Sequence, residues 1–214
     1  MYQFGFIGMG NMGSAMLKGC LSVFPASTLA FSRKDAVKGK ALSLETGAVW
    51  VDSNRACAEQ SRYIILAVKP QFYDGVLKEI QPVLDDSRII ISLAPSYTIA
   101  DLKQSLGASA RIIRAMPNTP AMVGEGMTGL SWSEDTERQE LMQFFTSFGK
   151  TETVPENLMD AVTAASGSSP AFIYMMIEAL ADGVVKYGMP RDKAYTFVAQ
   201  AVLGSAKMVL ETGE

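Results

Sequence analysis

The chain has 214 residues, enough for one large domain or two modest ones. Hydrophobic residues make up 48% and charged residues 19%, with a net charge of −3, so no basic patch is present that could follow a nucleic-acid backbone. No apolar run approaches the ~20 residues of a membrane span. The sequence contains no histidine, the commonest metal ligand, and we therefore expect no nucleic acid, no membrane and no metal site.

The two cysteines, Cys20 and Cys57, match neither a disulfide spacing nor a metal-ligand spacing. Cys20 falls in an apolar helical stretch, so we expect it to pack in the core. No signal peptide precedes the first expected strand, which begins at Tyr2. We therefore expect a reducing, cytoplasmic setting.

Strands and helices alternate through the first 154 residues. In chain order, the pattern predicts strand 2–8, helix 11–24, strand 28–31, helix 34–46, strand 49–51, helix 55–60, strand 63–68, helix 71–83, strand 88–93, helix 99–106, strands 111–115 and 127–133, helix 134–148 and strand 151–154. Two of these strands are apolar on nearly every residue, as strands covered on both faces are. The alternation predicts an α/β domain with a doubly wound parallel sheet.

A glycine-rich turn of sequence GMGNMG, residues 8–13, joins the first expected strand to the first helix. A G-x-G-x-x-G turn between a strand and a helix is typical of a dinucleotide-binding Rossmann domain. Gly8 would make the tight turn, Gly10 would admit the pyrophosphate and Gly13 would let the helix close on the sheet. Backbone N–H groups at the helix N-terminus would then face the phosphates.

The end of the second expected strand carries Ser32, Arg33 and Lys34. Proteins that prefer NAD have an acidic residue at this distance from the glycines, where it binds the ribose 2′-hydroxyl. A hydroxyl and a guanidinium would instead hold a 2′-phosphate. The sequence therefore predicts NADPH, with NADH as the alternative, and assigns Asp35 to the dipole of the next helix.

Two further loops follow strands of the expected sheet, at the edge where doubly wound sheets bind ligands. In the first, Pro70 directs the chain away from the strand and Lys69 would line the cofactor crevice. In the second, Asn118 lies between two prolines, either as a donor to a ligand or within a rigid connection.

After Pro155 the pattern predicts helices only, broken near 167–170 and 188–190. Residues 172–180 and 194–210 are apolar around almost the whole helix, and such helices must be buried on all sides. They pack either on the sheet domain or, as we favour, into a second subunit. We therefore expect a Rossmann domain at 1–154 and a helical dimerisation and substrate domain at 155–214.

The junction between the two regions has the sequence SGSSP, residues 166–170. Ser169 can cap the next helix, and Pro170 fits its first turn. A helix N-terminus beside the nicotinamide would also suit a substrate carboxylate, and the two readings are compatible.

These motifs, taken in order, resemble those of the pyrroline-5-carboxylate reductase family. The resemblance covers the whole chain and is carried by FIGMGNMG, LAVKPQ, RAMPNTPAMVGEGMTGL and DAVTAASGSSPAFIYMMIEALADGVVKYGMPRDKA. It implies a Rossmann domain followed by an all-α dimerisation domain. It also implies reduction of 1-pyrroline-5-carboxylate, a cyclic imino acid, to L-proline with NAD(P)H in the last step of proline biosynthesis. A homodimer is expected, with further assembly of dimers left open.

The resemblance also assigns site residues by position. The implied cofactor contacts are Gly8, Met9, Gly10, Asn11, Met12, Ser32, Arg33, Asn54, Val68, Lys69, Pro70, Ala94 and Pro95. The candidates on the substrate side are Glu156, which matches a family position near the amine of proline, and Ser166, Gly167 and Ser168. No residue is assigned as the proton donor.

Two features depart from the family pattern. Ser169 stands where the family usually has a small residue, which is a mild change. Family chains also continue with a His-Pro pair and a glycine- and threonine-rich loop that contacts substrate, whereas this sequence ends at Glu214. We therefore expect the helical domain to be incomplete at its C-terminal end.

Two other functions remain as alternatives. A β-hydroxyacid dehydrogenase-like NADP oxidoreductase would carry a lysine shortly after a glycine pair, and residues 167–178 contain none. A non-catalytic NADP-binding protein is the second. Reduction of C=N suits a chain without histidine, because an imine is basic enough to bind already protonated and needs no strong acid beside its carbon.

Overall fold

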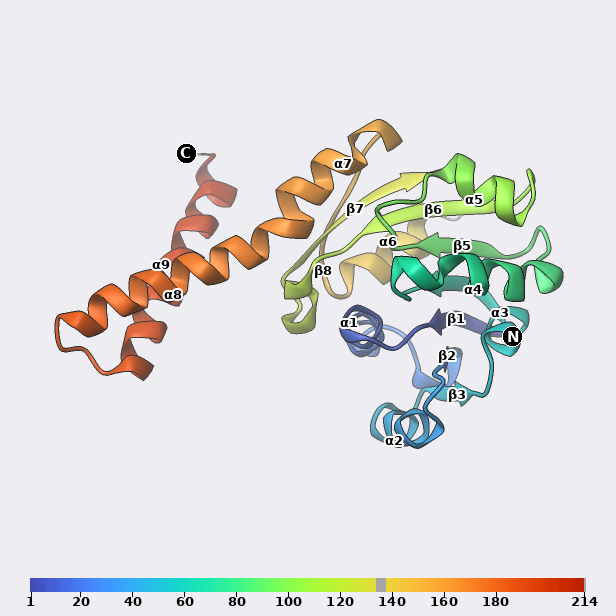
Figure 1. Ribbon diagram of the computed structural model, residues 1–214, viewed down its shortest axis with the longest axis horizontal. Coiled ribbons are helices and arrows are strands. Elements are labelled where there is room, and N and C mark those ends of the chain that lie inside the picture. The colour runs from blue at the N-terminus through green and yellow to red at the C-terminus, as the bar shows by residue number, and fades with distance from the viewer. Residues whose placement is uncertain (134–137, 214) are drawn as a thin grey trace. The chain divides into compact units, whose positions relative to one another are not determined.

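A computed structural model describes residues 1–133 and 138–213. The chain divides into two compact units, Met1–Gly167 and Ser168–Glu214 (Figure 1). The strands of the first unit are β1 Tyr2–Ile7, β2 Leu29–Ser32, β3 Val49–Val51, β4 Ser61–Leu66, β5 Ile89–Ser92, β6 Arg111–Met116, β7 Gly126–Trp132 and β8 Gly149–Thr153. Its α-helices are α1 Asn11–Cys20, α2 Ala36–Thr46, α3 Asn54–Glu59, α4 Tyr73–Ile80, α5 Ile99–Leu106, α6 Arg138–Thr146 and α7 Met159–Val162.

The eight strands form one sheet in the order β3-β2-β1-β4-β5-β6-β7-β8. Neighbours from β3 to β6 are all parallel. The order reverses between β1 and β4, which makes this a doubly wound Rossmann-type sheet with its switch point at that pair. The predicted fold class is confirmed, and the switch point places a ligand beyond the carboxyl ends of β1 and β4.

The last two strands, β7 and β8, run parallel to each other and against the other six. β7 pairs antiparallel with β6, Met116 lying opposite Gly129, although the sequence predicted a parallel sheet throughout. A parallel crossover needs a dozen or more residues. After β6 the chain has only a short 3₁₀ turn, Thr119–Val123. Gly124, at φ +77°, then reverses the chain direction, so that β7 runs antiparallel beside β6.

Two buried clusters cover the two faces of the sheet, because successive residues of a strand point in opposite directions. Phe4 and Phe6 enter the cluster shared with α1 and α6, whereas Ile7 enters the cluster shared with α3, α4 and α5. β4 and β5 are apolar on both faces, as their sequences predicted.

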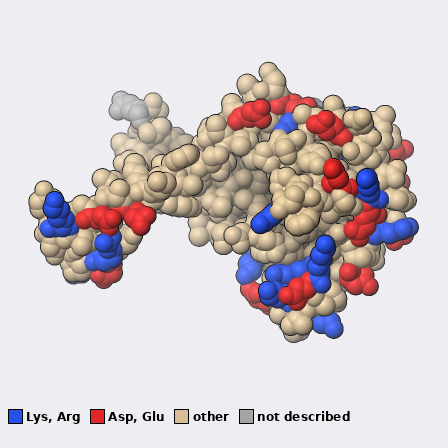
Figure 2. Space-filling view, in the orientation of Figure 1, with Lys and Arg blue, Asp and Glu red and all other residues tan. Residues whose placement is uncertain are grey.

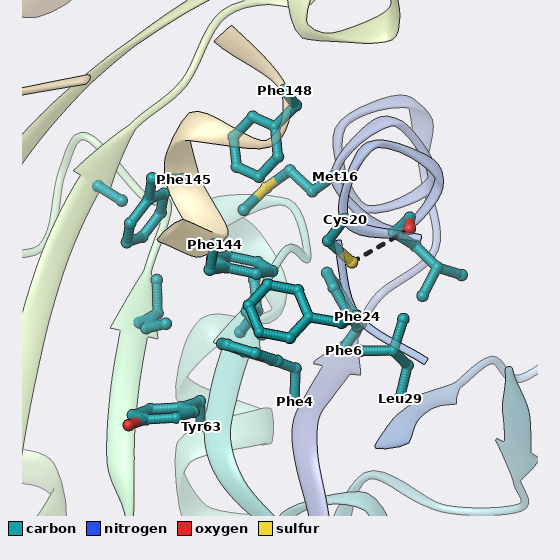
Figure 3. Packing of buried hydrophobic residues seen from close by; sticks show 14 of the residues in the cluster. Phe4, Phe6, Met16, Cys20, Phe24, Leu29, Tyr63, Phe144, Phe145 and Phe148 are labelled. Atoms are coloured by element: carbon teal, nitrogen blue, oxygen red, sulfur yellow. Dashed lines mark hydrogen bonds between the residues drawn. The ribbon is translucent and has the colours of Figure 1, made fainter. Parts of the chain in front are cut away.

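Aromatic rings dominate the first cluster (Figure 3). Phe4 stacks on Phe144 with ring centroids 4.2 Å apart, and Phe24 meets the edge of Phe4 at 5.0 Å. Cys20 is fully buried beside them and donates to the carbonyl of Leu17 at 3.2 Å. Burial raises the pKa of Cys20 to about 12, so the predicted packing role is confirmed.

Several helix ends differ from the prediction. The first helix ends at Cys20 because the N–H groups of Val23 and Phe24 turn back to its carbonyl. The second begins at Ala36, with Asp35 as its N-cap accepting from the N–H of Lys38 at 3.0 Å. This bond lowers the pKa of Asp35, whose carboxylate therefore serves the helix N-terminus as expected. Residues 134–137 of the expected helix 134–148 lie outside the described residues.

The residues that directly follow Pro155 pack with the sheet, whereas the sequence predicted that the separate helical domain begins there. Met159 is buried, and the side chain of Val162 lies against the bare Cα of Gly129 in β7. Residues 155–167 therefore belong to the first compact unit. The expected break near 167–170 is wrong, because a π-helix, Thr163–Ser168, runs directly into α8.

The second unit consists of α8 (Ser169–Lys186) and α9 (Arg191–Thr212). They pack through a small cluster of Ala181, Ala194 and Val198, and Gly213 ends α9 at φ +77° as a C-terminal glycine. Much of the remaining apolar surface is exposed: Phe172, Tyr174, Met175, Leu180, Phe197, Met208 and Leu210 each show half or more of their surface. In the face shown in Figure 2, the charged side chains of this unit gather toward the turn between the helices. No helix in the described part of the chain is long and apolar enough to cross a membrane.

Candidate functional site

The glycine turn after β1 has the geometry that its sequence predicted. Gly8 adopts φ +97°, and a Cβ there would lie 2.9 Å from the backbone of Ala67. A Cβ on Gly13 would lie 2.3 Å from the carbonyl oxygen of Gly8, so only glycine lets α1 approach this closely. Around Gly10, by contrast, a Cβ would meet no atom of the described residues within 4 Å. The turn therefore leaves space at the N-terminus of α1 for a pyrophosphate.

A cavity of about 490 Å³ opens at the carboxyl ends of β1, β2 and β4. It brings together six residues that the sequence assigned to the cofactor: Gly8, Met9, Ser32, Arg33, Asn54 and Val68. The other assigned residues lie outside this cavity, with Asn11 beginning α1 and Pro70 beginning the 3₁₀ turn Pro70–Phe72. The cavity lies at the switch point of the sheet, where a dinucleotide binds.

Three polar side chains form a continuous chain along the cavity wall. Ser32, only 2% exposed, donates its hydroxyl proton to Oδ1 of Asn54 at 2.7 Å. Nδ2 of Asn54 donates to Oε2 of Glu79 at 2.8 Å. Oε1 of Glu79 accepts the backbone N–H of Arg55 at 3.3 Å, so both carboxylate oxygens are engaged.

Two cations border the same cavity. The backbone carbonyl of Arg33 accepts from the indole N–H of Trp50 at 3.3 Å, which anchors the backbone at that position. Nζ of Lys34 lies 5.8 Å from the ring centroid of Phe72, within cation–π range. The positive groups predicted to favour a 2′-phosphate therefore line the cavity together with Ser32.

The part of the cavity lining that follows β4 was not predicted from the sequence. It consists of Gln71, Phe72, Gly75, Val76 and Glu79, from the turn after β4 and from α4. Phe72, Val76 and Glu79 follow a spacing of four and three residues and therefore share one helix face. That spacing was readable in the sequence, but only the fold shows that this face looks into the cavity.

Tyr73 joins the turns that follow β4 and β5. Its hydroxyl donates to the carbonyl of Leu66 at 2.8 Å and accepts the N–H of Leu93 at 3.1 Å. Burial raises the pKa of Tyr73 to about 12, so the phenol stays protonated at neutral pH. Tyr73 therefore acts as a structural link beside the cavity, a role that the sequence did not reveal.

Arg114, which is buried, forms an ion pair with the partly exposed Glu156 near the Ala94-Pro95 turn. Nη1 of Arg114, a residue only 4% exposed, donates to Oε1 of Glu156 at 2.9 Å, and Nη2 donates to the carbonyl of Pro95 at 2.9 Å. The same carboxylate oxygen accepts the N–H of Ile99, at the start of α5, at 2.7 Å. Glu156 is therefore connected through Arg114 to a turn that the sequence assigned to the cofactor.

Asn118 fastens the loop after β6. Its Nδ2 donates to the carbonyl of Ser166 at 3.0 Å, and its Oδ1 accepts the N–H of Met127 at 2.8 Å. Both the amide nitrogen and the amide oxygen of this buried side chain are used within the protein, which favours the interpretation of this loop as a rigid connection.

Ser169 lies inside a continuous helical path, so the helix N-terminus expected at that residue for a carboxylate is not formed.

Known proteins match this chain along its whole length. A sequence model described as pyrroline-5-carboxylate reductase dimerisation matches residues 156–214, and one described as coenzyme F420-dependent NADP oxidoreductase matches residues 3–96. The pyrroline-5-carboxylate reductase of Escherichia coli (strain K12) is 42% identical over 220 residues, which cover 99% of this chain and 81% of that protein. The chain belongs to the pyrroline-5-carboxylate reductase family.

Solved structures of the reductase family have the same fold. The pyrroline carboxylate reductase of Plasmodium falciparum, solved with NADP bound, matches with a TM-score of 0.88 and 31% identity, covering 100% of this chain and 80% of that one. The reductase of Coxiella burnetii matches with a TM-score of 0.90 and 31% identity, covering 100% and 81%. Membership of the reductase family excludes the β-hydroxyacid dehydrogenase alternative as the family of this chain.

Proposed function

We propose that this chain reduces 1-pyrroline-5-carboxylate to L-proline with NADPH as the hydride source. The observation that carries the proposal is the 42% identity with the Escherichia coli reductase, which extends over 99% of the chain and so includes both the cavity and the helical unit. NADH is the alternative cofactor. We further place the reaction in the cytoplasm, in keeping with two buried cysteines that form no disulfide.

We infer that the cavity receives the dinucleotide. Space at Gly10 and the N–H groups at the start of α1 would receive the pyrophosphate. Ser32, Arg33 and Asn54 would hold the ribose and its 2′-phosphate. The remaining proposed contacts are Gly8, Met9, Asn11, Met12, Val68, Lys69, Pro70, Ala94 and Pro95. When bound, the reduced nicotinamide supplies a hydride to the carbon of the C=N bond.

The protein's part in this reaction is to position the substrate and to exclude water. An imine is basic enough to be bound as its iminium ion, so the proton arrives with the substrate and no strong acid is required beside the carbon. Glu156, Ser166, Gly167 and Ser168 are the proposed residues on the substrate side. Arg114 supports the choice of Glu156, because it connects this carboxylate to the carbonyl of Pro95.

The direct test is NADPH oxidation with synthetic 1-pyrroline-5-carboxylate as substrate. The reaction is measured by the loss of reduced-nicotinamide absorbance and by the appearance of proline. We expect oxidation that depends on the imino acid. Tight NADPH binding without any turnover would instead indicate a non-catalytic NADP-binding protein, and turnover of a hydroxyacid alone would refute the reductase proposal.

Replacing Gly10 by alanine tests the proposed pyrophosphate position. The new Cβ would meet no described atom of the protein and would project into the space left for the ligand. Overpacking of this kind costs about 1–3 kcal/mol, so NADPH binding should weaken roughly 5- to 150-fold. Calorimetry measures the affinity, and urea unfolding should show unchanged stability.

Gly13→Ala is the matched variant, because its Cβ would collide with the carbonyl of Gly8 at 2.3 Å. It should lose stability as well as affinity. Unaltered NADPH affinity in Gly10→Ala would show that the pyrophosphate lies elsewhere.

We propose that the functional division of the chain is 1–154 for the cofactor and 155–214 for dimerisation and substrate. The chain matches the dimerisation model from residue 156 onward, and α8 and α9 enclose an apolar groove of about 610 Å³ that includes Met176, Phe197 and Val209. A second copy of the chain would cover these side chains. Assembly of dimers into a higher oligomer is a further proposal.

Phe197→Glu tests the dimer. Phe197 is 64% exposed in this groove, and a carboxylate at an apolar subunit interface is costly to desolvate. We expect the parent protein to sediment as a dimer or larger species at low concentration and the variant to sediment as a monomer. Tyr187→Glu, at the exposed turn between the helices, is the control that should leave the assembly unchanged. A parent protein that sediments as a folded monomer would contradict the proposal.

A further inference from the structure

The hydrogen bonds along the cavity wall have a defined direction. A carboxylate only accepts hydrogen bonds, so the side chain of Asn54 must turn its NH₂ group toward Glu79. Its carbonyl oxygen then faces Ser32, and the serine hydroxyl must donate to it. The carboxylate of Glu79 therefore fixes the orientation of Asn54, and Asn54 in turn holds the hydroxyl proton of Ser32 within the wall.

This direction determines what Ser32 offers to a ligand. With its proton engaged by Asn54, the hydroxyl presents only lone pairs to the cavity. A ribose 2′-hydroxyl can donate to those lone pairs, as in NADH. A 2′-phosphate offers mainly acceptor oxygens, so binding it requires Ser32 to release Asn54 and to leave a partly buried carbonyl without its donor.

From this we infer that Glu79 is a specificity-determining residue: by orienting Asn54 and through it Ser32, it lowers the preference for NADPH that Arg33 and Lys34 provide. The inference rests on the proposed function only in taking NAD(P)H as the ligand of this cavity. Glu79 lies in α4, far along the sequence from the strand-two residues that normally distinguish the two cofactors.

Simple repulsion between Glu79 and the phosphate is the competing explanation. The side chain of Glu79 is exposed, and water and salt weaken interactions between exposed charges. The hydrogen bonds act at 2.7 Å and 2.8 Å and end at a serine that is 2% exposed, where losing a partner is costly. The two explanations make different predictions for the same substitution in two backgrounds.

Glu79→Gln should reverse the chain of hydrogen bonds. The N–H of Arg55 needs an acceptor, so it will hold the glutamine oxygen at the position of Oε1. The glutamine NH₂ then faces Asn54, which turns its own NH₂ toward Ser32, and the serine proton becomes free for a phosphate. We expect the ratio of the NADH and NADPH dissociation constants to rise about tenfold, measured by calorimetry.

Asn54→Ala provides the background that separates the two explanations. Without the amide there is nothing to reorient, so Glu79→Gln should change the ratio no further when added to Asn54→Ala. An equal rise in that background would show that charge repulsion alone operates and would overturn the inference. An unchanged or lower ratio in the single variant would overturn it as well.

Binding of fragments separates this inference from the proposed reaction. Adenosine 2′,5′-bisphosphate and adenosine 5′-monophosphate carry the distinguishing phosphate and hydroxyl but no nicotinamide. Their affinity ratio should shift as the ratio for the full cofactors does, whether or not the protein turns over the imino acid. A shift confined to turnover would overturn the inference, while an intact fragment shift with no reductase activity would refute only the proposed function.

Discussion

Replacing Ser32 by aspartate is expected to weaken NADPH binding about a hundredfold and to leave NADH as the better-bound cofactor. Ser32 ends β2 at the cavity wall and is 2% exposed, so a carboxylate there would face a 2′-phosphate directly. Two like charges about 4 Å apart repel by up to about 4 kcal/mol at a partly exposed site. Calorimetric titration with both cofactors measures the reversal.

Ser32→Ala is the control for this prediction. It removes the hydroxyl without adding charge, so NADPH affinity should change by less than about tenfold, the range of one hydrogen bond. Equal loss in the alanine and aspartate variants would show that charge at this position does not determine the preference. The aspartate variant should also be less stable, because Asn54 cannot donate to Glu79 and to a carboxylate at position 32 at once. Adding Glu79→Gln should restore part of that stability.

Replacing Arg114 by methionine is expected to lower the free energy of unfolding by about 1–3 kcal/mol and to slow turnover. The buried guanidinium is the hydrogen-bond donor to two oxygens, and removing it leaves both without that donor. Here the loss affects the carboxylate of Glu156 and the carbonyl of Pro95, both bound by the guanidinium at 2.9 Å. Since the Ala94-Pro95 turn is a proposed cofactor contact, a misplaced turn should lower kcat more than it weakens NADPH binding. Urea unfolding, calorimetry and steady-state kinetics provide the three measurements.

Arg88→Met is the matched control. Arg88 is also buried, donates to the carbonyls of Ala58 at 3.1 Å and Glu59 at 2.6 Å, and forms an ion pair with Asp85. It lies before β5, at the opposite end of the parallel strands from the cavity. A similar loss of stability with unchanged kcat is expected. If both variants lost kcat equally, the effect would come from stability and not from the position of the turn.

Local chemistry explains why several residues of the cavity could be predicted from the sequence. The three glycine roles depend on backbone angles and close approaches within a few residues, and Gly8 at φ +97° and the tight contact of Gly13 follow from residues 8–13 themselves. The alternation of apolar strands and helices likewise predicted the doubly wound sheet, because a parallel strand pair requires a helical crossover. Ser32 and Arg33 could be placed beside the glycine turn because their distance from it is set by one βαβ unit.

Residues that act through distant partners were missed. Glu79 enters the site only because α4 packs beside α3, and Arg114 gains its role only when β6 places it opposite Glu156. Single charged residues of this kind look like ordinary surface or strand positions in the sequence. The reversed direction of β7 was missed as well, because an alternating strand has the same pattern in either direction.

The sequence by itself determined the two-part organisation, the glycine turn and the polar end of β2, since each depends on residues close together in the chain. Only the tertiary structure decided that residues 155–167 pack with the sheet, that the chain continues as a π-helix through Thr163–Ser168 into α8, and that Ser32, Asn54 and Glu79 form one chain of hydrogen bonds. The physical reason is the range of the interactions. Backbone conformation is set by neighbouring residues, whereas the direction of a hydrogen bond depends on every partner that the fold brings within about 3 Å.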